Sequence, residues 1–333
     1  MGCELVKIPP TYIKQIPPRN PISHGGSGIV EIDVNSIIFN IIDIDENQST
    51  FKLSFGLELR WKDRYLTYNF LTNLPQKNVV TKEMQEQIWI PKLHFLLLLQ
   101  KDNLFEAARI LFVEKKGLPL MENEIFESYS GTENWFTLET INQATFICSF
   151  DNIKSYPFGT QKCSFKLFIP GVDNSYTKLS SKSFVDDGPK SVGEYQIVQW
   201  TIQIGPVLSQ NQEKFKSNYS KTENNIGLIY TVHLSRKISN IILVTYLPTL
   251  LMNLLNQATN YISSEDKYEL IITVNITCMM VLASIYLSVS TSLPTTAEIK
   301  PVEVWLLFSL IYPVLLTVLN ILLQVSIKFR FYF

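Results

Sequence analysis

The sequence predicts a β-sandwich domain followed by a membrane domain of α-helices. After Lys237 the chain offers three uncharged stretches, 238–264, 270–297 and 304–327, and each exceeds the roughly 20 apolar residues that cross a bilayer as a helix. Before Lys237, charges are mixed throughout and short runs alternate between apolar and polar residues, which is typical of half-buried strands. The predicted domains are a flexible leader at 1–28, an extracellular β-sandwich at 29–236 and a transmembrane domain at 237–333, with helices at about 238–262, 270–292 and 302–327.

The leader contains Pro9-Pro10, Pro17-Pro18 and Gly25-Gly26. This composition predicts an extended, poorly ordered segment. It lacks a basic region followed by an apolar run and a small-residue cleavage site, so no signal peptide is visible.

The clearest strand runs over 51–61, where every second residue from Phe51 to Trp61 is apolar. The residues between them are polar, apart from Gly56. Such alternation gives one buried and one wet face. Similar β-rich runs occur near 31–43, 107–114, 136–150, 163–169, 194–204 and 226–235. Many short strands separated by turn-forming residues predict a β-sandwich.

Two of the four cysteines, Cys148 and Cys163, lie close together in the polar half of the chain. An extracellular compartment would oxidise them to a disulfide, and closing a loop of this size stabilises a fold by about 3 kcal/mol. The triplets that begin at Asn47 and Asn218 fit the acceptor pattern for N-glycosylation.

Enzyme and nucleic-acid functions find no support in the sequence. The net charge is -1, so the overall balance does not suggest a nucleic-acid partner. His24, His94 and His233 are scattered, and no cluster has the spacing of a metal site. Neither a nucleophile elbow nor a phosphate-binding loop is present. We therefore expect no catalytic residues, no metal and no cofactor.

The second apolar stretch carries hydroxyl residues on one helical face. Their spacing of three and four residues places them together on that face; they are Thr273, Thr277, Ser284, Ser288 and Thr291, with Met280 between them. A lone membrane helix would not present such a row to lipid. The alternatives are a contact between helices, which small hydroxyl residues also favour, and the wall of a water-filled pore.

The segment from Cys148 to Cys163, with Tyr156-Pro157-Phe158 at its tip, resembles the Cys-loop of pentameric ligand-gated ion channels. It has fourteen residues between the cysteines where the family usually has thirteen, and Gly159 replaces the usual Asp. Further matches follow in register over roughly residues 30–327; they are Trp61 to Asn69, Ile88 to Pro91 with Lys92 in place of an Asp, Tyr230 with Arg236, Pro248, Asn275 to Thr277, and Leu293-Pro294.

This resemblance implies one subunit of a pentamer of identical or related subunits, in the plasma membrane with its large domain outside. An agonist binding between the large domains would open a central pore to permeant ions. The family has a fourth membrane helix that this chain does not contain. The alternatives are an anion-selective channel of the same family and a non-conducting ligand-binding or accessory subunit.

In such a pore the hydroxyl face would be wetted, and Met280 would form an apolar constriction that gates by dewetting. Charges at the mouths set ion preference. Glu269 lies at the cytoplasmic end and nothing resembles the Pro-Ala element of the family's anion channels, which favours cations. Leu270 occupies the position where the glutamate of a cation channel is expected.

The family's aromatic ligand box maps onto Gly56, Leu96, Pro170 and Asn225, none of which is aromatic. A shifted alignment brings in Phe55, Phe95 and Tyr176, and Phe215 and Tyr219 lie in the loop at 205–225. An amine agonist is therefore not expected, and Leu96 and Pro170 favour an apolar or amphiphilic one. The competing interpretation is a degenerate site.

By the same resemblance, gating is coupled to the pore through loops at the membrane surface; the residues concerned are Glu46, Tyr156, Pro157, Phe158, Arg236 and Pro294. Opposite charges such as Arg236 and Glu46 would form a partly buried pair whose loss costs about 3 kcal/mol or more. Each charge could equally be solvated.

Overall fold

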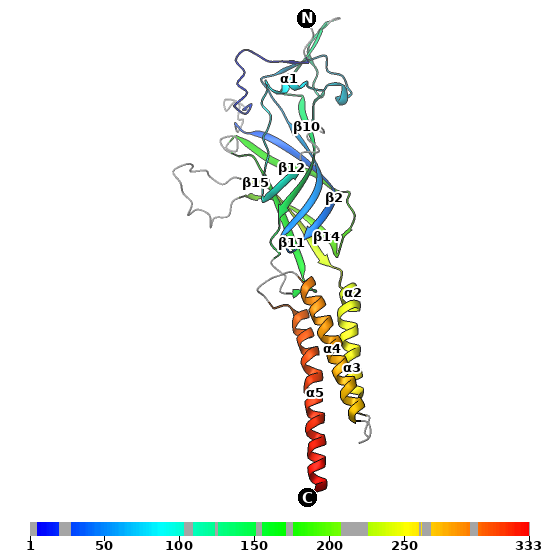
Figure 1. Cartoon of the computed structure of the whole chain (residues 1–333). Coiled ribbons are helices and arrows are strands. Elements are labelled where there is room, and N and C mark those ends of the chain that lie inside the picture. The colour runs from blue at the N-terminus through cyan, green and yellow to red at the C-terminus, as the bar shows by residue number, and fades with distance from the viewer. Residues whose placement is uncertain are drawn as a thin grey trace, which may run out of the picture. The chain divides into compact units, whose positions relative to one another are not determined.

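The computed structural model describes residues 5–19, 28–102, 109–123, 126–150, 155–170, 176–207, 226–259, 261, 268–293 and 299–332. The chain forms two compact units. The strand-rich unit comprises Met1–Ser149, Lys162–Gly193 and Ile197–His233, and the helical unit comprises Phe150–Gln161, Glu194–Gln196 and Leu234–Phe333. Figure 1 shows the strands of the first unit and the long helices of the second.

Three sheets make up the strand-rich part of the chain. A six-stranded sheet has the order β12-β2-β3-β10-β6, with β7 also paired to β10; its strands are β12 (Thr177–Asp186), β2 (Val30–Asp45), β3 (Thr50–Trp61), β10 (Trp135–Ile147), β6 (Leu98–Asp102) and β7 (Ile110–Glu114). A five-stranded sheet has the order β13-β14-β15-β11-β5; its strands are β13 (Ser191–Val192), β14 (Tyr195–Pro206), β15 (Ile226–Arg236), β11 (Thr160–Phe168) and β5 (His94–Leu96). A smaller sheet has the order β1-β4-β9-β8; its strands are β1 (Val6–Lys7), β4 (Thr67–Asn69), β9 (Phe126–Ser130) and β8 (Pro119–Asn123).

Aromatic side chains fill the space between the two larger sheets. In β3 the residues from Phe51 to Trp61 alternate between buried and half-buried, as the sequence predicts. Phe146 of β10 stacks on Phe165 of β11 with ring centroids 4.8 Å apart, and Phe165 stacks on Tyr230 of β15 at the same distance. Buried aromatic residues bring large apolar areas out of water, so this stack joins the two sheets into a sandwich.

The predicted strands are confirmed, whereas β12 and several short strands were not predicted. β12 mixes polar and apolar residues, and it is fixed by parallel pairing with β2, in which Thr177 faces Val30. The sequence predicts a poorly ordered leader, and the structure describes residues 5–19 of it. Val6 is fully buried and pairs with Tyr68 in β4, so pairing with a distant strand orders this proline-rich segment. Residues 20–27 lie outside the described residues.

Three helical spans follow the strands, close to the predicted limits. The first consists of α2 (Ile238–Ile241), a π-helical turn at Ile242–Tyr246 and α3 (Leu247–Thr259). The second is α4 (Tyr268–Ser292) and the third is α5 (Pro301–Tyr332). Pro248 lacks the N–H that an α-helix would use at that position, which accounts for the wide turn just before it. A short helix, α1 (Lys82–Gln85), and a 3-10 turn at Pro75–Lys77 lie in the strand-rich unit.

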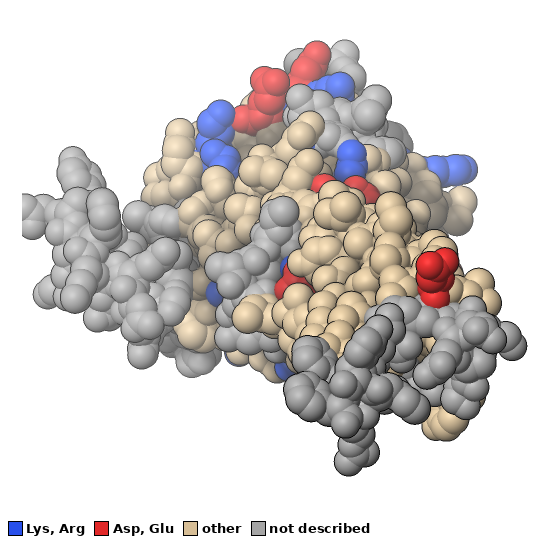
Figure 2. Space-filling view, turned by 60° about the horizontal axis from the view of Figure 1, so that its bottom comes forward, with Lys and Arg blue, Asp and Glu red and all other residues tan. Residues whose placement is uncertain are grey.

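All three spans are long and apolar enough to cross a membrane, and Figure 1 shows α3, α4 and α5 side by side. Polar contacts tie them together. Trp305 of α5 donates a hydrogen bond to Thr249 of α3 at 2.9 Å, and Thr259 of α3 donates one to Asn275 of α4 at 3.0 Å. Such bonds hold helices together where the surrounding lipid offers no hydrophobic gain. On the face drawn in Figure 2, much of the described surface carries no Lys, Arg, Asp or Glu.

Candidate functional site

Cys148 follows β10 and Cys163 lies in β11, and the structure joins them in a disulfide with 15 residues of sequence separation. The predicted pairing is therefore confirmed. Both sulfur-bearing residues are almost completely buried. The loop that they close carries the predicted tip, where the peptide bond between Tyr156 and Pro157 is cis.

Within the helical unit the tip residues meet the end of β15. The guanidinium of Arg236 lies 4.4 Å from the centre of the Tyr156 ring. It also donates to the Glu194 carboxylate at 2.5 Å and to the Tyr195 hydroxyl at 2.6 Å. Arg236 is only 9% exposed, so its charge is held by a carboxylate, a hydroxyl and aromatic ring faces instead of bulk water.

The same tip lies against the helices. Phe158 approaches Tyr246 of the first span with ring centroids 6.4 Å apart. Tyr156 and Tyr246 pack against a small apolar cluster formed by Leu293, Val302 and Leu306, which also receives side chains from the last turns of α4 and the first turns of α5. The tip of the loop, Arg236 and the end of α4 are thus parts of one packed cluster, which we call the tip cluster.

Sequence reasoning missed Glu194 and Tyr195. No spacing or motif marks them, since they lie about 40 residues before Arg236 and come to it only through the pairing of the five-stranded sheet. The backbone supports this approach, because Lys237 N–H donates to the Glu194 carbonyl at 2.7 Å. Glu46, the partner expected from the sequence, is half-buried in the other unit, and its pairing with Arg236 stays a prediction. Pro294 lies outside the described residues.

The helix α4 has two different faces. Asn275, Cys278 and Leu282 are buried toward the other helices. The predicted pore residues are all exposed on the opposite side, where Met280 has 70% of its surface free; they are Glu269, Thr273, Thr277, Met280, Ser284, Ser288 and Thr291. We call this set the polar face of α4.

Four hydroxyl groups of this face, those of Thr273, Thr277, Ser284 and Thr291, donate to carbonyls of their own helix. Thr273 donates to the carbonyl of Glu269 at 2.8 Å, Thr277 donates to that of Val274 at 2.8 Å, and Ser284 donates to that of Val281 at 2.7 Å. Each hydroxyl has one hydrogen and two lone pairs. Because the hydrogen is donated to the helix, the oxygen can only accept hydrogen bonds from, or coordinate, a group on the exposed side.

The described candidates for the ligand box differ in their exposure. Phe55 has no exposed surface and packs edge-on against Phe95 at 5.6 Å, so it belongs to the core and we leave it out of the proposed site. Leu96 and Pro170 are half-buried. Tyr176 is half-buried beneath Arg19, whose guanidinium lies 3.3 Å from the ring centre.

Other predicted residues are partly accounted for. Asn47 is exposed in the turn between β2 and β3, where an acceptor could be reached. Phe215, Tyr219, Asn218 and Asn225 lie outside the described residues.

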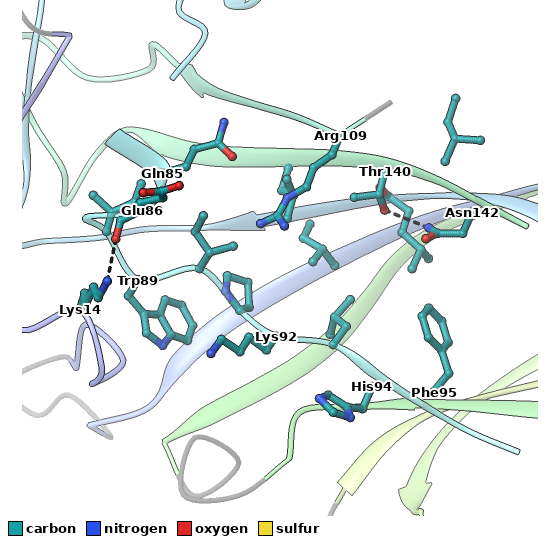
Figure 3. A pocket seen from close by; sticks show the side chains of 18 of the residues that line it. Lys14, Gln85, Glu86, Trp89, Lys92, His94, Phe95, Arg109, Thr140 and Asn142 are labelled. Carbon is teal, nitrogen blue, oxygen red and sulfur yellow. Dashed lines mark hydrogen bonds between the residues drawn. The ribbon is translucent and has the colours of Figure 1, made fainter. Parts of the chain in front are cut away.

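A cavity of about 730 Å³ opens in the strand-rich unit between the six-stranded sheet and the segment from Gln85 to Phe95. Its buried walls include Leu57 and Leu59 of β3 and Leu138 of β10. Figure 3 shows Arg109 reaching in among the lining side chains, with Trp89 and Lys92 to one side and Thr140 and Asn142 to the other. We call this the sheet-edge cavity.

Together, the disulfide-closed loop, the β-sandwich and the three apolar helices define a membrane protein of the ligand-gated channel class. Comparison with known proteins agrees. Residues 7–238 match the family described as "Neurotransmitter-gated ion-channel ligand binding domain". The chain therefore belongs to the neurotransmitter-gated ion-channel family, the Cys-loop class of pentameric channel subunits, which are not enzymes.

Individual relatives are distant. The gamma-aminobutyric acid receptor subunit rho-3 of Rattus norvegicus is 24% identical over 293 residues, which cover 86% of this chain and 56% of the relative. The pH-sensitive chloride channel 2 of Anopheles gambiae is 21% identical over 298 residues, which cover 87% of this chain and 45% of the relative. The gamma-aminobutyric acid receptor subunit pi of Rattus norvegicus is 23% identical over 294 residues, which cover 87% of this chain and 60% of the relative. The chain thus spans about half the length of these relatives.

Proposed function

We propose that five copies of this chain, or of this chain and related subunits, form a ligand-gated channel in the plasma membrane. The polar face of α4 carries this proposal. In one subunit it leaves seven predicted pore residues, Met280 among them, exposed on the side away from the other helices. A ring of such faces encloses a wetted channel, and a ring of Met280 side chains closes it by excluding water.

The proposed gate is opened through the tip cluster. An agonist bound between neighbouring large domains shifts the loop that carries Tyr156, Pro157 and Phe158. That loop contacts Arg236 and the apolar cluster at the end of α4. Packed clusters pass on displacement because interiors are dense and resist compression. Glu46 and Pro294 take part by the family resemblance alone.

We propose that the pore prefers cations. Glu269 lies in the first turn of α4 and is exposed, and the Thr273 hydroxyl is bonded to its carbonyl. A ring of carboxylates at a pore mouth attracts cations. The hydroxyl oxygens of Thr273, Thr277 and Ser284 turn lone pairs outward, which suits cations as well. The second candidate is an anion pore, because one relative is named a chloride channel.

The proposed agonist is a small apolar or amphiphilic molecule that contacts Leu96 and Pro170 at the cleft between subunits. Support comes from the lack of aromatic residues at the mapped box positions. Two relatives are named gamma-aminobutyric acid receptor subunits, so an amino acid is the second candidate. Full activation by a simple amine at low concentration would contradict both.

The test is whole-cell current from cells that express the chain alone, with agonist candidates from all these classes. Met280→Thr removes the apolar ring and is expected to give current without agonist. Met279→Thr is the matched control, since this neighbouring side chain is half-buried on another face. Equal behaviour of the two variants overturns the assignment of the gate. Silence of every form at proven surface expression favours a non-conducting or partner-dependent subunit.

Asn47 and Asn218 are the proposed glycan carriers. Asn47 is exposed. Amidase treatment should shift the gel mobility of the chain, and a smaller shift in Asn47→Gln, where the Asn218 glycan remains, tests the Asn47 site separately.

A further inference from the structure

The sheet-edge cavity lies beside a part of β10 where, among the described residues, one edge has no paired strand. On one edge β10 pairs continuously with β3. On the other edge, β7 pairs with β10 as far as Glu139, opposite Ile110, and β6 pairs from Gln143, opposite Asp102. Among the described residues no strand pairs with Thr140 to Asn142 on that edge. Beside this stretch of β10 the described residues line a cavity, and core leucines form its floor.

The floor of the cavity is apolar. Leu57, Leu59 and Leu138 are each at most 3% exposed. Trp89, which covers one end of the cavity, is also 3% exposed. The polar groups near the floor satisfy each other, since Asn142 donates to the Thr140 hydroxyl at 3.1 Å. A small inorganic ion gains little free energy from such walls. The apolar body of a small organic molecule gains more, because the walls remove its surface from water.

The rim of the cavity is cationic. The described lining residues include three lysines and one arginine, Lys14, Lys92, Lys101 and Arg109, and one acid, Glu86. Lys14 is held by the Glu86 carbonyl at 2.9 Å. Within the part of the chain that the structure describes, Lys92, Lys101 and Arg109 have no carboxylate partner. Figure 3 shows the Arg109 guanidinium inside the group of lining side chains, not turned away from it.

We propose that this cavity binds a small organic monocarboxylate with an apolar body. Arg109 pairs with the carboxylate through two parallel hydrogen bonds, a geometry for which guanidinium is suited, and Lys92 and Lys101 add positive potential at the mouth. The apolar body lies over the leucine floor. Amines are repelled by the rim, and neutral molecules leave its charges without a partner.

The volume agrees with this ligand class. Sites for small molecules usually measure about 300–1,000 Å³ and combine apolar walls with a few placed polar groups, and this cavity measures about 730 Å³. All lining residues come from one chain and from one of its units. The site is therefore complete without a neighbouring subunit, unlike the cleft between subunits that is proposed for the agonist.

The test measures binding alone, so it does not depend on the proposed channel activity. Saturation-transfer NMR on the purified full chain in detergent compares hexanoate, hexylammonium and hexanol, which share one apolar body and differ in charge. Hexanoate is expected to bind and the other two are not. Arg109→Gln is expected to weaken hexanoate about tenfold or more, because it removes a charge-assisted pair. Lys178→Gln is the control, an exposed lysine of β12 that does not line the cavity.

Arg109→Glu supplies a second variant and should abolish hexanoate binding. Because Arg109 is exposed at the rim, neither substitution should disturb folding, which a thermal unfolding curve checks. Equal binding of all three compounds overturns the proposal. So does hexanoate binding that both Arg109 variants retain, or binding that rises in proportion to added lipid and ignores Arg109, since that signifies partition into the membrane phase.

Discussion

The guanidinium of Arg236 donates to the carboxylate of Glu194 at 2.5 Å, across 42 residues of sequence. A second nitrogen donates to the Tyr195 hydroxyl at 2.6 Å. A planar fork with several donors is well suited to serve both partners at once, and this fixes the end of β15 beside the first membrane span.

Arg236→Gln is expected to destabilise the helical unit and to impair gating. Hydrogen bonds to charged groups contribute about 1.5–3 kcal/mol, and the loss should lie near the lower value because Glu194 is 57% exposed and screened by water. Arg236→Lys keeps the charge but is expected to be only partly active. Thermal unfolding measures the loss of stability, and the agonist concentration for half-maximal current measures the impairment of gating. Lys237→Gln, at the exposed neighbouring residue, should change neither; a Gln variant indistinguishable from that control contradicts the assigned role.

Loss of the disulfide is expected to lower stability by about 3 kcal/mol, since it closes a loop of about 15 residues. The double variant Cys148→Ser, Cys163→Ser leaves no odd thiol and should unfold at lower temperature or fail to reach the cell surface. Surface labelling and a thermal melt provide the readouts. Cys278→Ser, at the buried cysteine in α4, serves as the comparison. An unchanged melt of the double variant would show that the loop is held by its packing alone.

Asp63 gives the strand-rich unit a pH dependence. Its carboxyl is fully buried, accepts from the Tyr12 hydroxyl at 2.7 Å and from the Tyr65 N–H at 3.1 Å. Burial raises the pKa of Asp63 above its usual value, and the two hydrogen bonds only partly oppose this. The folded state therefore holds the proton more tightly than the unfolded state.

The stability that Asp63 contributes is fully present below the unfolded pKa of about 4 and is lost as pH rises through the raised folded pKa. Relative to Asp63→Asn, which cannot titrate, the wild-type chain should lose unfolding free energy as pH rises from about 4. Tryptophan fluorescence during urea unfolding at a series of pH values measures the difference. Asp43→Asn, at an exposed carboxyl, is the comparison variant. A difference that is independent of pH would mean that Asp63 ionises in the folded state as it does in water.

The proposed cation preference of the pore depends on Glu269. Glu269→Gln should move the reversal potential in a NaCl gradient toward zero, and Glu269→Lys should move it toward the chloride potential, because the sign of a charged ring at the mouth decides which ions concentrate there. Glu83→Gln, an exposed acid on α1, is the control. A native channel that already reverses at the chloride potential would favour the anion candidate and remove Glu269 from its role.

Local patterns determined much of this architecture. The alternation in β3, the cysteine spacing and the length of the apolar stretches each depend on neighbouring residues, and each predicted the observed element. The partners of Arg236 could not be predicted in this way, because Glu194 and Tyr195 reach it through sheet pairing. The same holds for the packing of residues 5–19, where Tyr12 bonds to Asp63 across 51 residues.

The sheet-edge cavity shows the same limit. Leu57, Leu138 and Arg109 carry no common motif, and they line one space because sheet pairing brings their strands together beside β10. Phe55 illustrates the opposite error. Its residue type suits an aromatic ligand box, but strand alternation turns it into the core.

The central claim, that the polar face of α4 lines a water-filled pore, is tested most directly by cysteine accessibility. Ser284 is exposed on that face and Leu282 is 2% exposed toward the other helices. A membrane-impermeant cationic thiol reagent, applied during agonist-evoked current, should block the Ser284→Cys channel irreversibly and leave both Leu282→Cys and the parent chain unchanged. Block of Leu282→Cys with no effect on Ser284→Cys would place another face of α4 toward the ions and contradict the account.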